Sequence, residues 1–443
     1  MPRRVLCYCL LCVVAGLANA QHEEQRQGPA SLFVKAGKLL DVRKGTYVNN
    51  AAIWIEAERI KEVGPISQVV AHAPRGVEVI DLSRLTVMPG LIDCHTHLMA
   101  RFDDTPDAYL LGLATKSEAF RALEGAADAR VTLLAGFTTV RDVENEGSMY
   151  ADVALRDAIQ QGLVDGPRMQ VATRAIAAVG QYNPFGVSPD LTNFPTGAQM
   201  VSGVEEASRA VREQIGHGAD LIKVYADWQH PTLTVDEMRV IVEEAHKQKR
   251  KVAAHATTPE GIKNAVTAGV DSIEHGHGAD RQAIEMIKAK GIFLVPTVGV
   301  VDEFVLKRKN GAMSLEERRR LEQFLLGIQE EITVARELGV KMASGFDASS
   351  AGLQGKNAEE LVGLVKRGLS PADAIRCATM NAAELLGWED RLGVLEAGKY
   401  ADVIGVEGDP LTNIIALQHV QFVMKGGKVK KDASIEGVRD RAR

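Results

Sequence analysis

The sequence predicts an α/β fold in which a (β/α)8 TIM-like barrel carries a small β-sandwich lobe formed from both chain ends. In the middle of the chain, short apolar runs alternate with amphipathic stretches at intervals of roughly thirty residues, as in a parallel sheet with crossover helices. Strand-like segments without helical periodicity occupy both ends. With 443 residues, 46% of them hydrophobic, the chain is long enough for one barrel and a second lobe.

The first twenty residues have the pattern of a cleavable secretory signal. Arg3-Arg4 form a basic start, residues 5–16 an apolar core, and Ala18-Asn19-Ala20 a small-residue cleavage site. The apolar run is too short to span a bilayer as a helix. A lipoprotein signal ending at Cys12 is the alternative, but the residues before it are larger than such a signal requires. We therefore expect a periplasmic or secreted protein without a membrane partner after cleavage.

The β-lobe is expected to combine residues 21–88 with residues 391–443. In the first part, apolar runs such as Ala51-Ala52-Ile53-Trp54-Ile55 are separated by turn residues, which is typical of short strands. The second part has a similar run at residues 402–406. The barrel would then be one continuous domain, residues 89–390, between the two halves of the lobe.

Eight candidate strands supply the barrel. They cover residues 85–93, 138–140, 168–172, 221–224, 252–255, 272–275, 293–296 and 342–345. Helical patterns lie between them, such as the runs that begin with Thr234-Val235-Asp236-Glu237 and with Ser314-Leu315-Glu316-Glu317. In such a barrel the catalytic groups lie at the C-terminal ends of the strands.

Charge and cysteine content exclude two classes of protein. The net charge of −6 at pH 7 argues against nucleic acid as a partner. Removal of the signal would leave only Cys94 and Cys377 of the five cysteines, so no disulfide framework is expected. Both lie in apolar surroundings and are predicted to be small buried hydrophobic residues.

Metal-ligand side chains occur at the ends of several predicted strands. His95 and His97 end the first strand, and alternate strand residues point the same way, so both imidazoles can reach one ion. His255 and His275 end two later strands, and Asp347 follows the last. Taken singly, each histidine is more often a hydrogen-bonded core or surface residue, and Asp347 could cap a helix. Their common place at strand ends predicts a two-metal hydrolase site.

Lys223 lies in an apolar strand, where an unpaired ammonium is costly to bury. Burial lowers the pKa of a lysine, and a neutral amine can react with carbon dioxide to form a carbamate. The two oxygens of a carbamate can bridge two cations. We therefore expect a carboxylated lysine at Lys223.

Taken together, these motifs resemble the metal-dependent amidohydrolase superfamily, in the branch with imidazolonepropionase-like proteins, prolidase-like dipeptidases and ochratoxin-degrading amidohydrolases. The resemblance covers nearly the whole mature chain. It rests on residues 88–97, 136–142, 222–223, 255–256, 273–276, 345–348 and 393–402. The His95-Thr96-His97 element and the final Gly398-Lys399-Tyr400-Ala401-Asp402 element are highly specific together.

The resemblance implies a role for each ligand candidate. The ligands would be His95, His97 and Asp347 for one metal and His255 and His275 for the other, with carboxylated Lys223 bridging the two. Zinc is the default for imidazole and carboxylate ligands, and manganese, cobalt or iron are open alternatives. Two cations activate water and polarise the scissile carbonyl, and Asp347 would carry the water's proton to the leaving amine. A homo-oligomer is also implied.

Substrate contacts are expected near the third and fourth strands. Many relatives have Gly-Gly-His in the loop where this chain has Gln181 and Tyr182, so either residue could replace the histidine. Tyr225 shares the strand parity of Lys223 and either donates to a substrate α-carboxylate or is a buried tyrosine. The loops at residues 102–104 and 182–185 would line the entrance.

Three further residues are candidates for the site, and two of them have a second interpretation. Arg174 and Arg141 are candidates for binding a substrate anion, although Arg141 could equally pair with Asp142. His277 could enter the pocket, or it is an ordinary loop histidine.

The function expected from this pattern and resemblance is hydrolysis of a small-molecule amide. We expect an exported binuclear zinc amidohydrolase that cleaves N-acyl amino acids or dipeptides, including ochratoxin A, which would give ochratoxin α and L-phenylalanine. A cyclic amide or lactone hydrolase of the same superfamily is the alternative enzyme. A metal-binding relative without activity is the non-enzymatic alternative, and the complete ligand set argues against it.

Overall fold

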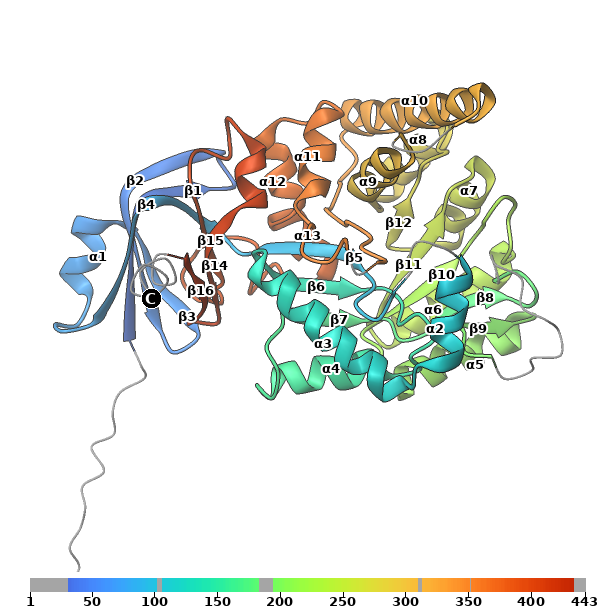
Figure 1. Cartoon of the computed structure of the whole chain (residues 1–443), viewed down its shortest axis with the longest axis horizontal. Coiled ribbons are helices and arrows are strands. Elements are labelled where there is room, and N and C mark those ends of the chain that lie inside the picture. The colour runs from blue at the N-terminus through green and yellow to red at the C-terminus, as the bar shows by residue number, and fades with distance from the viewer. Residues whose placement is uncertain (1–30, 102–105, 183–193, 310–312, 351, 434–443) are drawn as a thin grey trace, which may run out of the picture.

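The computed structural model describes residues 31–101, 106–182, 194–309, 313–350 and 352–433. The predicted signal at residues 1–20 lies outside these ranges, and so do residues 102–104 and 183–185 of the predicted entrance loops. The molecule has two parts, a β-lobe and a larger α/β body (Figure 1). None of the helices in the described ranges is long and apolar enough to cross a membrane.

The β-lobe contains strands from both ends of the chain. Its elements are β1 (Ser31–Asp41), β2 (Thr46–Glu56), β3 (Arg59–Pro65), α1 (Ile66–His72), β4 (Glu78–Pro89), β14 (Val403–Val406), β15 (Val420–Lys425) and β16 (Lys428–Asp432), with a 3-10 turn (Ile414–Gln418) before β15. The strands form one sheet in the order β16-β15-β14-β4-β1-β2-β3. The predicted pairing of both chain ends is therefore present in the structure.

The lobe is a single mixed sheet, which corrects the prediction of a two-sheet sandwich. The twelve-residue strand β4 pairs with β1 on one side and with β14 on the other, so it joins both halves into one sheet. The sheet curls around a shared core that includes Ile53 from β2 and Phe422 from β15. Ile60 of β3 also exchanges backbone hydrogen bonds with residues 398 and 399, which brings the far edge back toward the C-terminal half.

The α/β body alternates strands with helices. Its strands are β5 (Leu91–Thr96), β6 (Phe137–Asp142), β7 (Arg168–Val171), β8 (Ala175–Ala178), β9 (Ala198–Val201), β10 (Leu221–Tyr225), β11 (Lys251–Ala256), β12 (Ser272–His275) and β13 (Phe293–Val295). Its helices are α2 (Pro106–Thr115), α3 (Glu118–Leu134), α4 (Ala151–Gln160), α5 (Val204–Gly216), α6 (Val235–Lys247), α7 (Pro259–Ala268), α8 (Arg281–Lys290), α9 (Val298–Lys309), α10 (Leu315–Leu338), α11 (Glu359–Lys366), α12 (Pro371–Cys377) and α13 (Met380–Leu386). Thr234 and Ser314 begin α6 and α10 with reciprocal capping boxes, as expected where both segments start.

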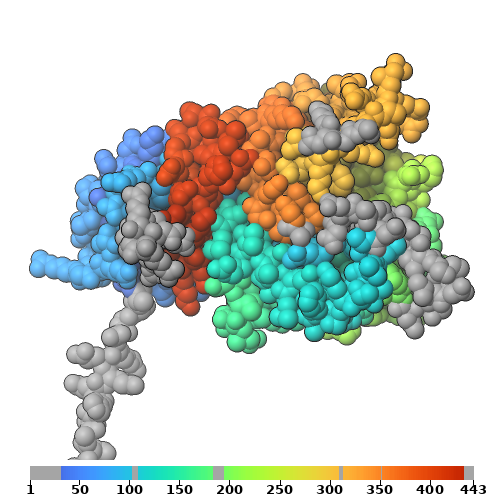
Figure 2. All heavy atoms as spheres, in the orientation of Figure 1, coloured from blue at the N-terminus to red at the C-terminus, as the bar shows by residue number. Residues whose placement is uncertain are grey.

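The body is TIM-barrel-like. Parallel ladders join β5-β6-β7 and β8-β10-β11-β12-β13, and β9 pairs with the outer side of β8. The two groups approach each other where the amide of Asp220, just before β10, donates to the carbonyl of Val171 in β7. A large apolar core lies between the sheet and its helices, with Ile222, Val252 and Ile273 fully buried. Figure 2 shows the lobe, in blue and red, seated against one side of this body.

Two details of the body differ from the sequence prediction. Residues 342–345 form no regular strand and contact β13 through one isolated bridge, between Leu294 and Met342. They still fill the gap between β13 and β5, because the carbonyl of Ser344 accepts from Cys94. The approach is so close that a Cβ on Gly345 would lie 2.6 Å from the Cβ of His95. Neither β8 nor β9 was predicted, although β8 pairs with β10 in the sheet.

Candidate metal centre

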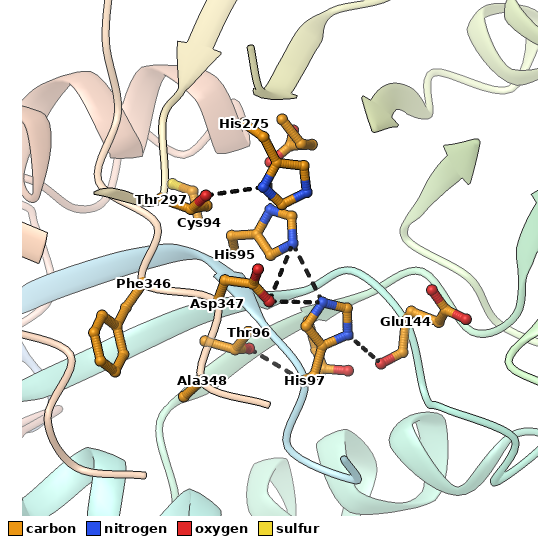
Figure 3. A network of polar contacts seen from close by, with 12 residues as sticks. Cys94, His95, Thr96, His97, Glu144, His275, Thr297, Phe346, Asp347 and Ala348 are labelled. Carbon is orange, nitrogen blue, oxygen red and sulfur yellow. Dashed lines mark hydrogen bonds and ion pairs between the residues drawn. The ribbon is translucent and has the colours of Figure 1, made fainter. Parts of the chain in front are cut away.

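Three of the predicted ligands converge on one point. His95 is in β5, His97 follows its end, and Asp347 reaches them because its amide donates to the carbonyl of His95 at 2.8 Å. The Nε2 atoms of the two histidines are 3.2 Å apart, and Oδ1 of Asp347 lies 3.3 Å from Nε2 of His97 and 3.8 Å from that of His95 (Figure 3). These donor atoms are close enough to hold one cation together.

Carboxylates behind the two histidines orient their rings. Nδ1 of His95 lies 2.8 Å from Oε2 of buried Glu274, and Nδ1 of His97 lies 3.1 Å from Oε1 of Glu146. A carboxylate accepts only, so each pair places the ring proton on Nδ1 and leaves Nε2 as a bare electron pair. Both bare nitrogens then face the point that Asp347 also faces, which is the arrangement that a cation requires.

The other predicted ligands lie next to this group. The ring of His275 is centred 4.9 Å from that of His95 and 4.6 Å from that of His255. Nδ1 of His275 lies 2.8 Å from the hydroxyl of Thr297. Within the described chain, Nε2 of His255 is buried without a hydrogen-bond partner, which is rare for a buried polar atom and fits a metal ligand.

Lys223 lies in the middle of β10 with only 1% of its surface exposed. No carboxylate of the described residues forms an ion pair with it. Burial lowers the pKa of Lys223, although nearby Glu274 and Glu144 oppose this shift. A lysine held toward its neutral form without a carboxylate partner among the described residues has the character needed for carbamate formation.

The backbone at two ligands adopts an unusual conformation. His275 has φ of 70° and Asp347 has φ of 61°, in the left-handed region that non-glycine residues rarely occupy. His275 is the last residue of β12, and Asp347 follows the extended segment at residues 342–345. The left-handed conformation turns each side chain away from the direction that strand alternation would give it. Such strain is stabilised by surrounding contacts and often occurs at functional sites, although Asn50, Ala57 and Lys249 also have positive φ elsewhere in this chain.

The local electrostatics of three of the four predicted histidine ligands suit cation binding. His97 is the exception, because burial would lower its pKa but the carboxylates of Asp347 and Glu146 raise it. Burial lowers the pKa of His95 to about 4, and the charge of Lys223 acts in the same direction. Burial also lowers the pKa values of His255 and His275. Burial would raise the pKa of Asp347, but the neighbouring histidines and Lys223 lower it to about 2. Neutral imidazoles and an ionised carboxylate are the forms that bind a metal ion.

The two tyrosines predicted to contact substrate share a different partner. The hydroxyls of Tyr182 and Tyr225 both donate to the carboxylate of Glu144, which is fully buried. Trp228 stacks on Tyr225 with ring centroids 4.7 Å apart and also contacts His255. These side chains form an aromatic wall beside the histidines.

The remaining predicted site residues do not belong to the group of donor atoms around His95, His97 and Asp347. Gln181 is exposed, and Arg174 donates to the backbone carbonyl of Ala198. Nε2 of His277 lies 2.7 Å from the carbonyl of Pro296, as for an ordinary loop histidine. Arg141 forms an internal ion pair, but with Glu274 at 2.7 Å rather than with Asp142.

Several residues of the centre were missed in the sequence. Glu144 and Glu146 directly follow β6, so their place at the end of a parallel strand was an available signal. Glu274, which orients His95, is a charged residue inside an apolar strand, the same signal that identified Lys223. The contribution of Thr297 has no comparable signal, because a threonine after a strand is common.

Comparisons with known proteins agree with this geometry. A sequence model of the amidohydrolase family matches residues 86–430. Ochratoxinase from Aspergillus niger is 33% identical over 424 residues, covering 88% of this chain and 85% of that protein. Imidazolonepropionase from Geobacillus kaustophilus is 24% identical over 419 residues, covering 86% of this chain and 90% of that protein.

Solved structures give the same result. A Xaa-Pro dipeptidase with methionine bound in its active site superposes with a TM-score of 0.79 at 33% identity, covering 90% of this chain and 99% of that one. The A. niger ochratoxinase structure superposes with a TM-score of 0.78 at 30% identity, covering 91% and 96%. These matches support the TIM-barrel-like architecture of the body.

Proposed function

The chain belongs to the amidohydrolase family, and on this premise we propose that it is a binuclear zinc enzyme that cleaves the amide bond of N-acyl amino acids and dipeptides. The broader activity follows from its relatives: the protein is a hydrolase acting on amide bonds. Similarity to ochratoxinase makes ochratoxin A a specific candidate substrate, with L-phenylalanine and ochratoxin α as products.

The observation that carries the proposal is the convergence of bare donor atoms at the end of the barrel. Nε2 of His95, Nε2 of His97 and Oδ1 of Asp347 face one point, with buried Nε2 of His255 unpartnered nearby. This donor set fits zinc. His95, His97 and Asp347 would hold one ion, and His255 and His275 the other, with a carbamate on Lys223 between them. Bound metal would supply Lewis-acid activation of water and of the scissile carbonyl.

Asp347 is placed to move the proton. Its side chain is 22% exposed, whereas that of His95 is only 1% exposed, so its carboxylate can reach a water at the mouth of the barrel. With a pKa of about 2 it is ionised at neutral pH and can accept the proton of the attacking water. The same proton can then pass to the leaving amine as the carbon–nitrogen bond breaks.

The test is release of phenylalanine from ochratoxin A by zinc-loaded protein, followed by mass spectrometry. Replacing the proton carrier in Asp347→Asn should lower turnover by about 10²- to 10⁴-fold while leaving part of the bound metal in place. N-acyl-phenylalanine compounds should also be cleaved. If the metal-loaded wild type releases no phenylalanine from either kind of substrate, the assignment is wrong.

One observation favours the alternative, a cyclic amide or lactone hydrolase. The hydroxyl of Tyr225 already donates to the buried carboxylate of Glu144, so it is not free to bind a substrate carboxylate. A cyclic amide needs no such contact. A panel that includes a cyclic imide and a lactone beside N-acyl amino acids separates the two functions. Hydrolysis of the cyclic substrates should tolerate Tyr225→Phe, because they need no carboxylate contact.

We also propose that the protein is exported and forms a homo-oligomer. The basic start, apolar core and small-residue end of residues 1–20 support export. Mass spectrometry of protein recovered outside the cytoplasm should find a chain beginning after Ala20. Light scattering on the same material measures the oligomeric state, and a monomer at all concentrations contradicts the proposal.

A further inference from the structure

A cavity of about 900 Å³ lies between the body and the β-lobe. Its walls include Arg168, the first residue of β7, and Asp220 and Arg250, which directly precede β10 and β11. Those positions are the N-terminal ends of the strands, whereas the predicted metal ligands lie toward the C-terminal ends. Because the two groups lie at opposite ends of the same strands, the cavity is separate from the metal centre. Its volume suits a small organic molecule.

The cavity is strongly basic. Seven arginine and lysine side chains line it, against three carboxylates. Some of this charge is neutralised, because Arg156 lies 2.7 Å from Asp220 and Arg168 lies 3.2 Å from Asp402. Lys430 likewise pairs with Asp165, and Arg391 pairs with Asp390. The excess positive charge therefore belongs to the other basic residues of the wall.

Three of these cations have no carboxylate partner among the described residues: Arg250, Lys425 and Lys428. The body contributes Arg250, and the lobe contributes both lysines, which flank the turn between β15 and β16. The ammonium of Lys425 donates to the carbonyl of Gly166. Within the described chain, the buried Nε of Arg250 has no hydrogen-bond partner.

This arrangement is unfavourable without an anion. Burial, together with the charge of Arg168, lowers the pKa of Lys425 to about 8. The buried Nε of Arg250 costs free energy without an acceptor, and so does the half-buried ammonium of Lys425 without a counterion. A multiply charged oxyanion would remove both costs, because it accepts several hydrogen bonds and carries more than one negative charge.

We propose that this cavity binds a small phosphorylated molecule, with its phosphate oxygens held by Arg250, Lys425 and Lys428. A guanidinium matches two phosphate oxygens at once, and two ammonium groups supply further point charges. Apolar surface for the rest of the ligand is present, since Ile159, Met169 and half-buried Trp388 also line the cavity. The ligand would contact both parts of the molecule, so its binding should stabilise the lobe against the body.

Titration calorimetry with pyrophosphate, on metal-loaded protein, tests the proposal. We expect saturable binding that weakens as salt is added, and a rise in melting temperature. Lys428 is exposed, so Lys428→Gln should fold normally and bind pyrophosphate about tenfold more weakly, the loss expected for one charge-assisted contact. Arg250→Gln should lose a similar factor.

The matched control is Lys290→Gln, which removes the same charge from the exposed end of α8. It should bind pyrophosphate as the wild type does. Pyrophosphate can also contact metal ions at the other end of the barrel, and such binding would be unchanged by Lys428→Gln. The proposal is overturned by wild-type affinity in both Lys428→Gln and Arg250→Gln, or by an equal loss in Lys290→Gln.

Discussion

His95 and His97 each have a carboxylate at Nδ1, on the side of the ring away from Asp347. Glu274 accepts from Nδ1 of His95 and is itself held by Arg141 at 2.7 Å and by the hydroxyl of Ser272. Burial would raise the pKa of Glu274, but Arg141 and His95 overcome this effect and lower it below its ordinary value. The buried pair of Glu274 with Arg141 therefore keeps an ionised acceptor behind the histidine at all physiological pH values.

Removing this acceptor should weaken metal binding without removing a ligand. In Glu274→Gln, His95 loses its orienting partner and Arg141 keeps only neutral ones, so we expect metal affinity to fall about 10- to 100-fold. Metal content after dialysis against a graded chelator series measures this affinity. Glu285→Gln, an exposed change on α8, serves as control. Unchanged metal affinity in Glu274→Gln would show that Glu274 does not orient a ligand.

The proposed carbamate makes a separate prediction for Lys223. Lys223→Ala should lose the bridge between the two ions, so we expect it to retain at most one metal per chain and little turnover. Because a short carboxylate such as propionate also supplies two oxygens, it should restore part of the activity in the space that the mutation leaves. Two metals per chain and full activity in Lys223→Ala would contradict the bridging role.

At the scale of elements, the ends of strands and helices place the charged groups. One buried carboxylate links two helices of the body. Oε2 of Glu360 in α11 accepts a hydrogen bond of 2.6 Å from the amide of Gly299 in α9. The other oxygen of Glu360 has no partner among the described residues. Burial raises the pKa of Glu360 to about 8, although the hydrogen bond from Gly299 opposes the shift.

The pKa of Glu360 predicts how stability depends on pH. Its folded pKa is raised above the unfolded value of about 4.3, so the folded state binds the proton more tightly. The contribution of Glu360 to stability is therefore complete below that unfolded pKa and is lost as pH rises toward 8. Glu360→Gln mimics the protonated acid and should flatten the fall in unfolding free energy between about pH 5 and pH 8.

Urea unfolding at a series of pH values measures this difference. Glu316→Gln on the exposed first turn of α10 should leave the pH profile unchanged. An identical slope in the wild type and in Glu360→Gln would show that the buried carboxyl does not stay protonated in the folded protein.

At the scale of the whole molecule, the two chain ends depend on each other. The core of the lobe contains side chains from β1 to β4 together with β14 and β15, so neither half buries its apolar face alone. The chain passes from the lobe into the body between β4 and β5, and it returns to the lobe at β14, after the last helices of the body. Loss of the C-terminal strands should therefore affect the N-terminal strands as well.

A single substitution in the lobe core tests this dependence. Phe422→Ala removes a fully buried ring from β15 and should cost about 3–5 kcal/mol of unfolding free energy, as for other buried aromatic residues. Phe120→Ala removes a ring that is 51% exposed on α3 and should change stability by less than about 0.5 kcal/mol. Urea midpoints and hydrogen exchange in β1 and β2 would show whether the N-terminal strands lose protection too. Protection that is lost only in β15 and its neighbours would contradict a shared core.

Much of the fold followed from local patterns. Seven of the eight predicted barrel segments overlap observed strands, because short apolar runs between helical patterns have few other solutions. The first segment straddles β4 and β5, since an apolar run does not reveal which sheet each half joins. The prediction of a strand at residues 342–345 was wrong. These residues are apolar because they pack between β13 and β5, and they form only an isolated bridge instead of a regular hydrogen-bond ladder.

The sequence by itself determined the family, the α/β class and the ligand candidates. The ligand candidates could be recognised because burying a polar side chain at the end of an apolar strand costs free energy, and a functional role explains why such a residue is there. Tertiary structure alone decided their partners. It placed Glu274 behind His95 and Glu144 against Tyr225, and it paired Arg141 with Glu274. These partners are far apart in sequence and meet only when parallel strands close side by side. No local pattern records which long-range carboxylate will neutralise a buried donor, because that choice depends on three-dimensional packing.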